Sequence, residues 1–226
     1  MLYFYILFLL KKFILILIHS YTEDLRKKIM LSDYIVTPEN RANGKTYSAV
    51  RFLINQKKKR NCTIVTNVKS FCAFDDTIYI DNINDVIDWT IDYCARLDIS
   101  GQESNVIIFF DEIFTVLSRD KAVDKKFRSF LSQFRKRKII FITTAQEWLE
   151  LPMTFRRYCR YQIDSNMTNI PLTNRAILFN YIYDAELMKW SQLDNDYIAP
   201  IIQTNIAKCN VNIIKCYDTF ETIKTD

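Results

Sequence analysis

The stretch that decides the fold is YIVTPENRANGKT, residues 34–46, in which an apolar run, a polar loop and a Gly-Lys-Thr triplet follow one another. The run predicts a strand, and the amphipathic stretch after it predicts a helix over 45–56. Backbone N–H groups at such a helix start bind phosphate oxygens, a lysine there reaches the β and γ phosphates, and a threonine hydroxyl binds Mg²⁺. A plain capped helix is the alternative interpretation. The predicted nucleotide-binding residues are Asn40, Arg41, Ala42, Asn43, Gly44, Lys45, Thr46 and Tyr47.

A second apolar run, VIIFF at 106–110, leads directly into Asp111 and Glu112. A buried strand that ends in two carboxylates can place one beside a metal ion and the other beside an attacking water. We therefore predict that Asp111 and Thr46 hold Mg²⁺ and that Glu112 is the general base. A solvated acidic turn is the simpler alternative.

A third apolar run, KIIFIT at 138–143, is followed by polar residues that include Gln146. If this strand lies beside the acidic one, Gln146 comes near the γ phosphate, where it could orient water or report hydrolysis. Alternatively, Thr143 or Thr144 caps a helix that follows the strand.

Strands and helices alternate along residues 33–165, which indicates an α/β domain with helices on both faces of a parallel sheet. Within the helix predicted over 123–136, phenylalanine and leucine recur at helical spacing and are expected to be core residues. The remaining predicted strands are 62–66, 77–80 and 176–183, and the remaining helices are 84–97 and 185–190.

Composition narrows the functional classes. The chain has 226 residues, a net charge of +5 and 49% apolar residues, which excludes global disorder, a collagen-like chain and a multi-span transporter. Six cysteines without ligand spacing and a single histidine make structural zinc improbable, and reduced thiols are expected.

Three segments are predicted from these patterns. Residues 1–29 are strongly apolar but contain Lys11 and Lys12, so they form either a weak membrane anchor or an upstream extension to a protein that starts at Met30. Residues 30–165 form the nucleotide-binding domain. Residues 166–226 form an appendage whose structure the sequence does not predict.

Four quoted stretches together resemble the zonula occludens toxin-like ATPases of filamentous-phage assembly, within the FtsK/HerA class of DNA-pumping motors. These stretches are GKTYSAV at 44–50, IVTNV at 64–68, FFDE at 109–112 and FRKRKIIFITTAQ at 134–146. The resemblance implies a P-loop NTPase with a RecA-like three-layer sandwich and a mainly parallel sheet, and ATP and Mg²⁺ as cofactors. The sequence departs from the family's loop at Glu39 and Ala42, and its apolar segment precedes the domain instead of following it.

The same resemblance implies partners and a location. It implies a homo-oligomeric ring acting on phage DNA, single-stranded rather than double-stranded, with the host inner membrane or phage coat proteins as further partners. In such rings an arginine of one subunit completes its neighbour's site; the candidates are Arg156, Arg157 and Arg160, of which we select Arg157. Ordinary surface charge at the end of a helix is the alternative interpretation. The expected location is the host cytoplasm, at the cytoplasmic face of the inner membrane if residues 1–29 anchor the chain.

Two alternative functions stay open at this stage. One is a DNA-packaging ATPase that fills a preformed capsid, and the other is a non-hydrolysing nucleotide-binding scaffold, which Glu39 favours. The basic residues around the helix at 123–136, and the run 57–60, are either a solvated face or a track for DNA phosphates.

Overall fold

The computed structural model describes residues 34–37, 44–117, 124–146, 148–170, 175–192 and 196–218. The predictions for residues 1–29 and for Asn40 to Asn43 therefore lie outside the described residues. No helix within the described ranges is long and apolar enough to cross a membrane.

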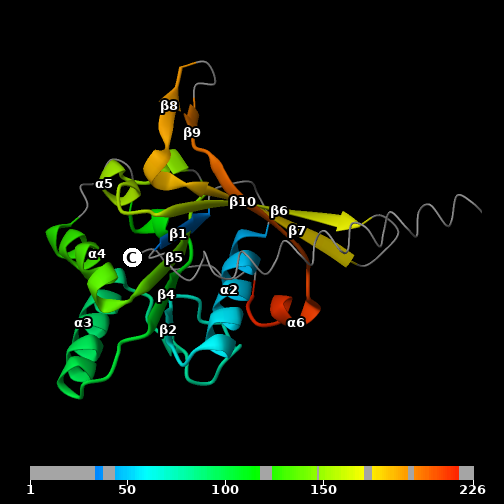
Figure 1. The fold of residues 1–226 in the computed structure, drawn as a ribbon. Coiled ribbons are helices and arrows are strands. Elements are labelled where there is room, and N and C mark those ends of the chain that lie inside the picture. The colour runs from blue at the N-terminus through cyan, green and yellow to red at the C-terminus, as the bar shows by residue number, and fades with distance from the viewer. Residues whose placement is uncertain are drawn as a thin grey trace, which may run out of the picture.

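One half of the main sheet is parallel and has helices on both faces (Figure 1). Its strands, in spatial order, are β1 (Tyr34–Thr37), β5 (Ile140–Thr144), β4 (Val106–Phe110), β2 (Thr63–Thr66) and β3 (Ile78–Tyr79). Its longer helices are α2 (Lys45–Lys59) on one face and α3 (Ile83–Ile99) and α4 (Lys125–Arg137) on the other. The prediction of a three-layer α/β sandwich with a mainly parallel sheet is confirmed, because helices lie on both faces and every neighbouring pair among these strands is parallel.

The other half of the sheet is antiparallel and comes from the later part of the chain. Strand β6 (Tyr161–Ile170) pairs in parallel with β1, and β7 (Arg175–Asp184) and β10 (Ile201–Lys208) extend the sheet beyond it. The sequence boundary predicted at 165/166 therefore falls inside β6. The remaining short elements are η1 (Ile113–Thr115), η2 (Trp148–Glu150), α5 (Met153–Arg156), η3 (Ala185–Leu187), β8 (Lys189–Ser191), β9 (Asp196–Ile198) and α6 (Val211–Ile214).

The helix predicted over 185–190 is wrong beyond its first turn. The side chain of Asp184 accepts a hydrogen bond from the Glu186 N–H, which starts the 3-10 turn η3. Met188 is already extended, and Trp190 pairs with Tyr197 in the small β8–β9 sheet. Cross-strand pairing thus replaces the intrahelical hydrogen bonds that a longer helix would need.

The two faces of the parallel strands enter two separate apolar cores. On β4, Ile107 and Phe109 point to the core under α2, whereas Ile108 and Phe110 point to the core under α3 and α4. All five residues of this strand are buried, which is why its sequence is a continuous apolar run. The core assignment for α4 is confirmed, because its four predicted apolar residues are buried: Phe127, Phe130, Leu131 and Phe134.

The basic residues in and directly after α4, here called the basic cluster, include several that pair with acidic residues of the segment 83–103. Lys126 pairs with Asp88 at 2.7 Å and Arg137 with Asp98 at 3.4 Å, and both pairs join α4 to α3. Lys138, which follows α4, pairs with Glu103 at 2.6 Å. These contacts support the interpretation of the cluster as a solvated, ion-paired face.

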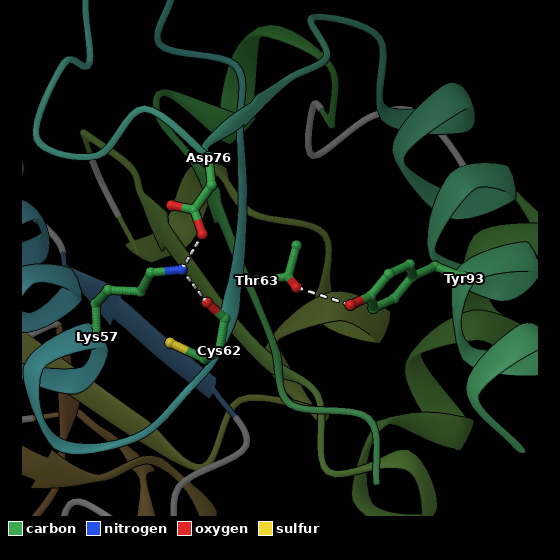
Figure 2. Close-up of polar contacts among 5 residues, drawn as sticks. All are labelled: Lys57, Cys62, Thr63, Asp76 and Tyr93. Carbon is green, nitrogen blue, oxygen red and sulfur yellow. Dashed lines mark hydrogen bonds and ion pairs between the residues drawn. The ribbon is translucent and has the colours of Figure 1, made fainter. Parts of the chain in front are cut away.

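The start of β2 is fixed from both sides (Figure 2). Lys57, in the last turn of α2, donates to the Cys62 carbonyl at 2.6 Å and pairs with Asp76 at 2.5 Å. On the opposite side, the Thr63 and Tyr93 hydroxyls are 2.9 Å apart. These contacts lie at the amino end of β2, away from the functional groups described next.

Candidate active site

The site begins at Gly44, the residue before α2. Its φ of +87° is a left-handed conformation that glycine adopts without steric cost. A Cβ at this position would lie 3.0 Å from Leu178 Cδ1 and 3.2 Å from Met167 Cβ. Both the backbone conformation of Gly44 and its close approach to the β6–β7 hairpin therefore require glycine.

The two residues after Gly44 reach the carboxyl ends of two central strands. The Lys45 ammonium donates to the Ala145 carbonyl at 3.2 Å, just past the end of β5. The Thr46 hydroxyl donates to Asp111 Oδ2 at 3.2 Å, at the end of β4. The carboxyl edge of a parallel sheet is where open α/β folds bind ligands, and these contacts lie there.

The carboxylate of Asp111 is held by side chains of α2 and β5. It accepts hydrogen bonds from the hydroxyls of Thr46 and Thr144. Burial raises the pKa of Asp111 to about 6, the Thr144 and Thr46 hydrogen bonds oppose the increase, and the Glu112 carboxyl adds to it. A half-buried carboxylate with a raised pKa is a group that a cation would stabilise in its charged form.

Asn67 holds the main chain of Asp111 from the neighbouring strand. The Asp111 N–H donates to Asn67 Oδ1 at 2.7 Å, and Asn67 Nδ2 donates to the Asp111 carbonyl at 3.0 Å. The Asn67 amide, which is 3% exposed, thus replaces a pair of backbone hydrogen bonds where β2 has ended. Sequence reasoning gave this residue no role, although the Thr-Asn pair after the second strand was part of the family resemblance.

Glu112 has an unusual backbone conformation for a side-chain-bearing residue, with φ 52° and ψ 51°. Its N–H donates to the Thr144 hydroxyl at 2.8 Å, and its carbonyl accepts from the Thr115 hydroxyl at 2.9 Å. The strained backbone is therefore held on both sides, as is common at functional sites.

Thr144 contacts the acidic pair, whereas Gln146 lies exposed in the bend after β5. The alternative in which Thr143 or Thr144 caps a helix is wrong, because both hydroxyls contact β4 or the residues that follow it. Thr143 donates to the Phe110 carbonyl at 2.6 Å, and Thr144 bridges the Asp111 carboxylate and the Glu112 N–H. The threonines meet β4 because β5 and β4 are adjacent and in register.

The oxygen donors present are those that Mg²⁺ prefers. Magnesium is usually held by one or two carboxylates, a hydroxyl, water and substrate phosphates instead of an all-protein cage. Thr46 and Asp111 supply one hydroxyl and one half-buried carboxylate within hydrogen-bonding distance of each other. Among the described residues no group of three or more His, Cys, Asp or Glu could hold a metal ion.

Comparisons with known proteins place the fold. No family model and no curated protein matches the sequence. Among solved structures, the genome packaging NTPase B204 from Sulfolobus turreted icosahedral virus 2, in complex with ATP-gammaS, has a TM-score of 0.50 and 12% identity over 76% of this chain and 99% of that chain. The N-terminal domain of zonular occludens toxin from Neisseria meningitidis has a TM-score of 0.50 and 13% identity over 83% of this chain and 99% of that chain.

The chain has the P-loop NTPase fold. The fold that the sequence resemblance predicted is thereby confirmed, and one of the matching structures belongs to the predicted family. Lys45 and Thr46 begin α2, and Asp111 and Glu112 directly follow β4.

Two other predicted site residues lie in different surroundings. Tyr47 is 1% exposed, and its hydroxyl accepts a hydrogen bond from the Asn210 N–H at 2.7 Å, so its side chain is covered by the carboxyl-terminal segment. Arg157 is exposed after α5, with its guanidinium 3.9 Å from Met153 Sδ. Its neighbour Arg160 pairs with Glu186 instead.

Proposed function

We propose that this protein is an ATP-hydrolysing motor that drives export or packaging of viral DNA during virion assembly. The observation that carries the proposal is the meeting of Lys45, Thr46 and Asp111 at the carboxyl ends of β4 and β5. A lysine ammonium and a hydroxyl at one helix start, with a half-buried carboxylate beside them at a strand end, form a set suited to a triphosphate with its magnesium ion.

Each residue has a proposed role in hydrolysis. Lys45 binds the β and γ phosphates, and Thr46 with Asp111 holds Mg²⁺, which supplies charge neutralisation on the phosphates when bound. Glu112 accepts the proton of the attacking water. Thr144 fixes the positions of both acidic residues, and Gln146 keeps its predicted role of orienting water or reporting hydrolysis.

ATP turnover by the full chain tests these roles. Lys45→Ala and Glu112→Gln should both abolish hydrolysis, while Glu112→Gln should still bind ATP, because only the proton acceptor is removed. Lys58→Ala is the matched control, since Lys58 is an exposed lysine at the far end of the same helix. Unchanged turnover in either site variant would contradict the assignment.

A ring of identical subunits is the second part of the proposal. Arg157 is exposed at the end of α5 and free to reach a neighbouring subunit, where its charge would stabilise the transferred phosphoryl group. Arg157→Ala should bind ATP but not hydrolyse it. Mixing it with Glu112→Gln subunits should restore part of the turnover, because mixed rings contain sites with both groups intact, and no restoration in mixed rings would exclude a role in trans.

The choice of a viral genome as cargo is supported by one similar structure, which is described as a genome packaging NTPase, and the choice of DNA follows from the sequence resemblance. That structure favours packaging into a capsid, and the other, a domain of zonular occludens toxin, favours the extrusion system of the sequence resemblance. ATPase stimulation by single-stranded against double-stranded DNA, across a salt series, tests the substrate, because phosphate contacts weaken steeply with salt. We place the protein in the host cytoplasm, with residues 1–29 as the segment that would attach it to the inner membrane.

A further inference from the structure

The carboxyl-terminal segment Cys209–Asp218, here called the C-terminal strap, lies beside the first turns of α2. Figure 1 shows its short helix α6 next to α2. The strap is attached near its start by the hydrogen bond from the Asn210 N–H to the Tyr47 hydroxyl. Near its end, the Cys72 N–H donates to the Cys216 carbonyl at 2.9 Å, and the Asp218 N–H donates to Ser70 Oγ at 2.8 Å.

These attachments reach the two segments that hold Asp111. Tyr47 follows Thr46, whose hydroxyl contacts the Asp111 carboxylate. Ser70 and Cys72 lie in the turn that begins at Asn67, whose amide holds the Asp111 main chain. The strap therefore joins the start of α2 to the turn after β2, on either side of the metal-binding carboxylate.

Tyr217 lies between Cys216 and Asp218, the two strap residues that are hydrogen-bonded to the turn after β2. It is 8% exposed and belongs to the apolar cluster that contains Tyr47, Val68 and Phe71. Burial raises the pKa of the Tyr217 phenol, and the Asp111 carboxyl is close enough to raise it further. Within the described part of the chain, no hydrogen bond is found to the Tyr217 hydroxyl, although its ring is packed.

We propose that Tyr217 is a positioning residue of the magnesium–nucleotide site, held there by the C-terminal strap with its hydroxyl toward the oxygen atoms around Asp111. A phenol hydroxyl in this place can hydrogen-bond the Asp111 carboxylate or a water ligand of the cation, and so orient the cation's ligands. The proposal rests on the proposed function, because it requires that Asp111 holds Mg²⁺.

The test measures binding of a fluorescent ATP analogue to the full chain, with Mg²⁺ and with EDTA. Tyr217→Phe removes only the hydroxyl and should raise the Mg²⁺ concentration for half-maximal binding about tenfold, the usual effect of losing a partner of a metal ligand. Binding in EDTA should stay unchanged. Tyr93→Phe is the matched control, because it also removes one tyrosine hydroxyl but acts on Thr63, at the opposite end of β2 from Asn67 (Figure 2).

A second variant acts on the strap without touching Tyr217. Ser70→Ala removes the acceptor of the Asp218 N–H and should shift the Mg²⁺ requirement in the same direction, but less. If Tyr217→Phe binds with the wild-type Mg²⁺ dependence, the proposal is overturned, whatever Ser70→Ala does. An equal shift in Tyr93→Phe would also overturn it, because the effect would then be general loosening of the fold.

Failure of the proposed function gives a different pattern. In that case the wild-type protein would not bind the analogue in a Mg²⁺-dependent way, or Lys45→Ala would bind as tightly as the wild type. If the wild type shows Mg²⁺-dependent binding that Lys45→Ala loses, the function stands, and the Tyr217→Phe result decides the role of Tyr217 alone.

Discussion

Replacing Asp111 with asparagine should make the ligand-free protein more stable, and the gain should grow with pH. The folded-state pKa of Asp111 is about 6, against an ordinary value of 3.8. Because the pKa is raised, the folded protein binds the extra proton between these two values, and the stability of the wild type falls as pH rises through that window. Asparagine has the same shape and no charge, so it removes this dependence.

The magnitude follows from the two pKa values. Integrating proton binding from about pH 5 to about pH 8 gives the wild type a loss of about 1.4 kcal/mol that Asp111→Asn does not share. For a chain of this size the loss corresponds to about 3–6 °C in melting temperature. Urea unfolding at the two pH values, without nucleotide or metal, measures it directly.

Asp76→Asn is the matched control for this measurement. The hydrogen bond from Lys57 lowers the pKa of Asp76 below 3.8, so this group titrates below the tested window. The stability difference between Asp76→Asn and the wild type should therefore be the same at both pH values. If the Asp111→Asn difference is equally constant, or shrinks as pH rises, the raised pKa that we assign to Asp111 is wrong.

Three other substitutions have expected effects on stability. Asn67→Ala removes both hydrogen bonds to the Asp111 main chain and should lower the free energy of unfolding by about 2–3 kcal/mol in urea titrations, and a loss below about 0.5 kcal/mol would contradict the clamp. Gly44→Ala should lower the free energy of unfolding by at least about 1 kcal/mol more than Gly101→Ala does in thermal melts. Both glycines have a positive φ, but only at Gly44 would the added Cβ lie 3.0 Å from a neighbour. Equal losses in the two variants would refute the close packing at Gly44. Phe141→Ala should cost about 3–5 kcal/mol, since its ring stacks on Phe134 at 5.7 Å within the core, and a cost under about 1 kcal/mol would be incompatible with that burial.

The parallel half of the fold could be predicted because its strands are apolar on both faces. The run at 106–110 is buried at every position, and such a run admits few other interpretations. Boundaries were less accurate, because they depend on local backbone geometry. The strand predicted from Lys138 starts at Ile140, since Lys138 adopts a left-handed conformation that ends α4.

The antiparallel half was harder to predict because polar residues occupy core-facing positions. On β6, Ile163, Ser165 and Met167 point to the same face, but the buried Ser165 interrupts the apolar alternation that would have marked a strand. Its cross-strand partner Asn180 is also buried, for a reason that lies in another element, since it donates to Ser48 of α2 at 2.7 Å. The spacing of apolar residues along the sequence does not indicate that Ser48 is the partner of Asn180.

The same limit applies to the candidate site. Lys45, Thr46 and the acidic pair carry their chemistry in a local motif, so the sequence alone nominated them. Asn67 and Thr144 act only because β2 and β5 are the two neighbours of β4, which is a property of strand order. Tyr217 is more than a hundred residues from Asp111 along the chain, and its position follows from the path of the last strand and the segment after it.

The hydrogen bond between Asn180 and Ser48 connects the first turn of α2 to the antiparallel half of the sheet. Ser48 lies one turn after Gly44, and Asn180 lies in the middle of β7, between β6 and the edge strand β10. Close-packed interiors transmit small shifts. A displacement of the first turn of α2 should therefore be passed directly to β7, because no loop lies between the two side chains. We expect the edge strand β10 to shift whenever the first turn of α2 shifts.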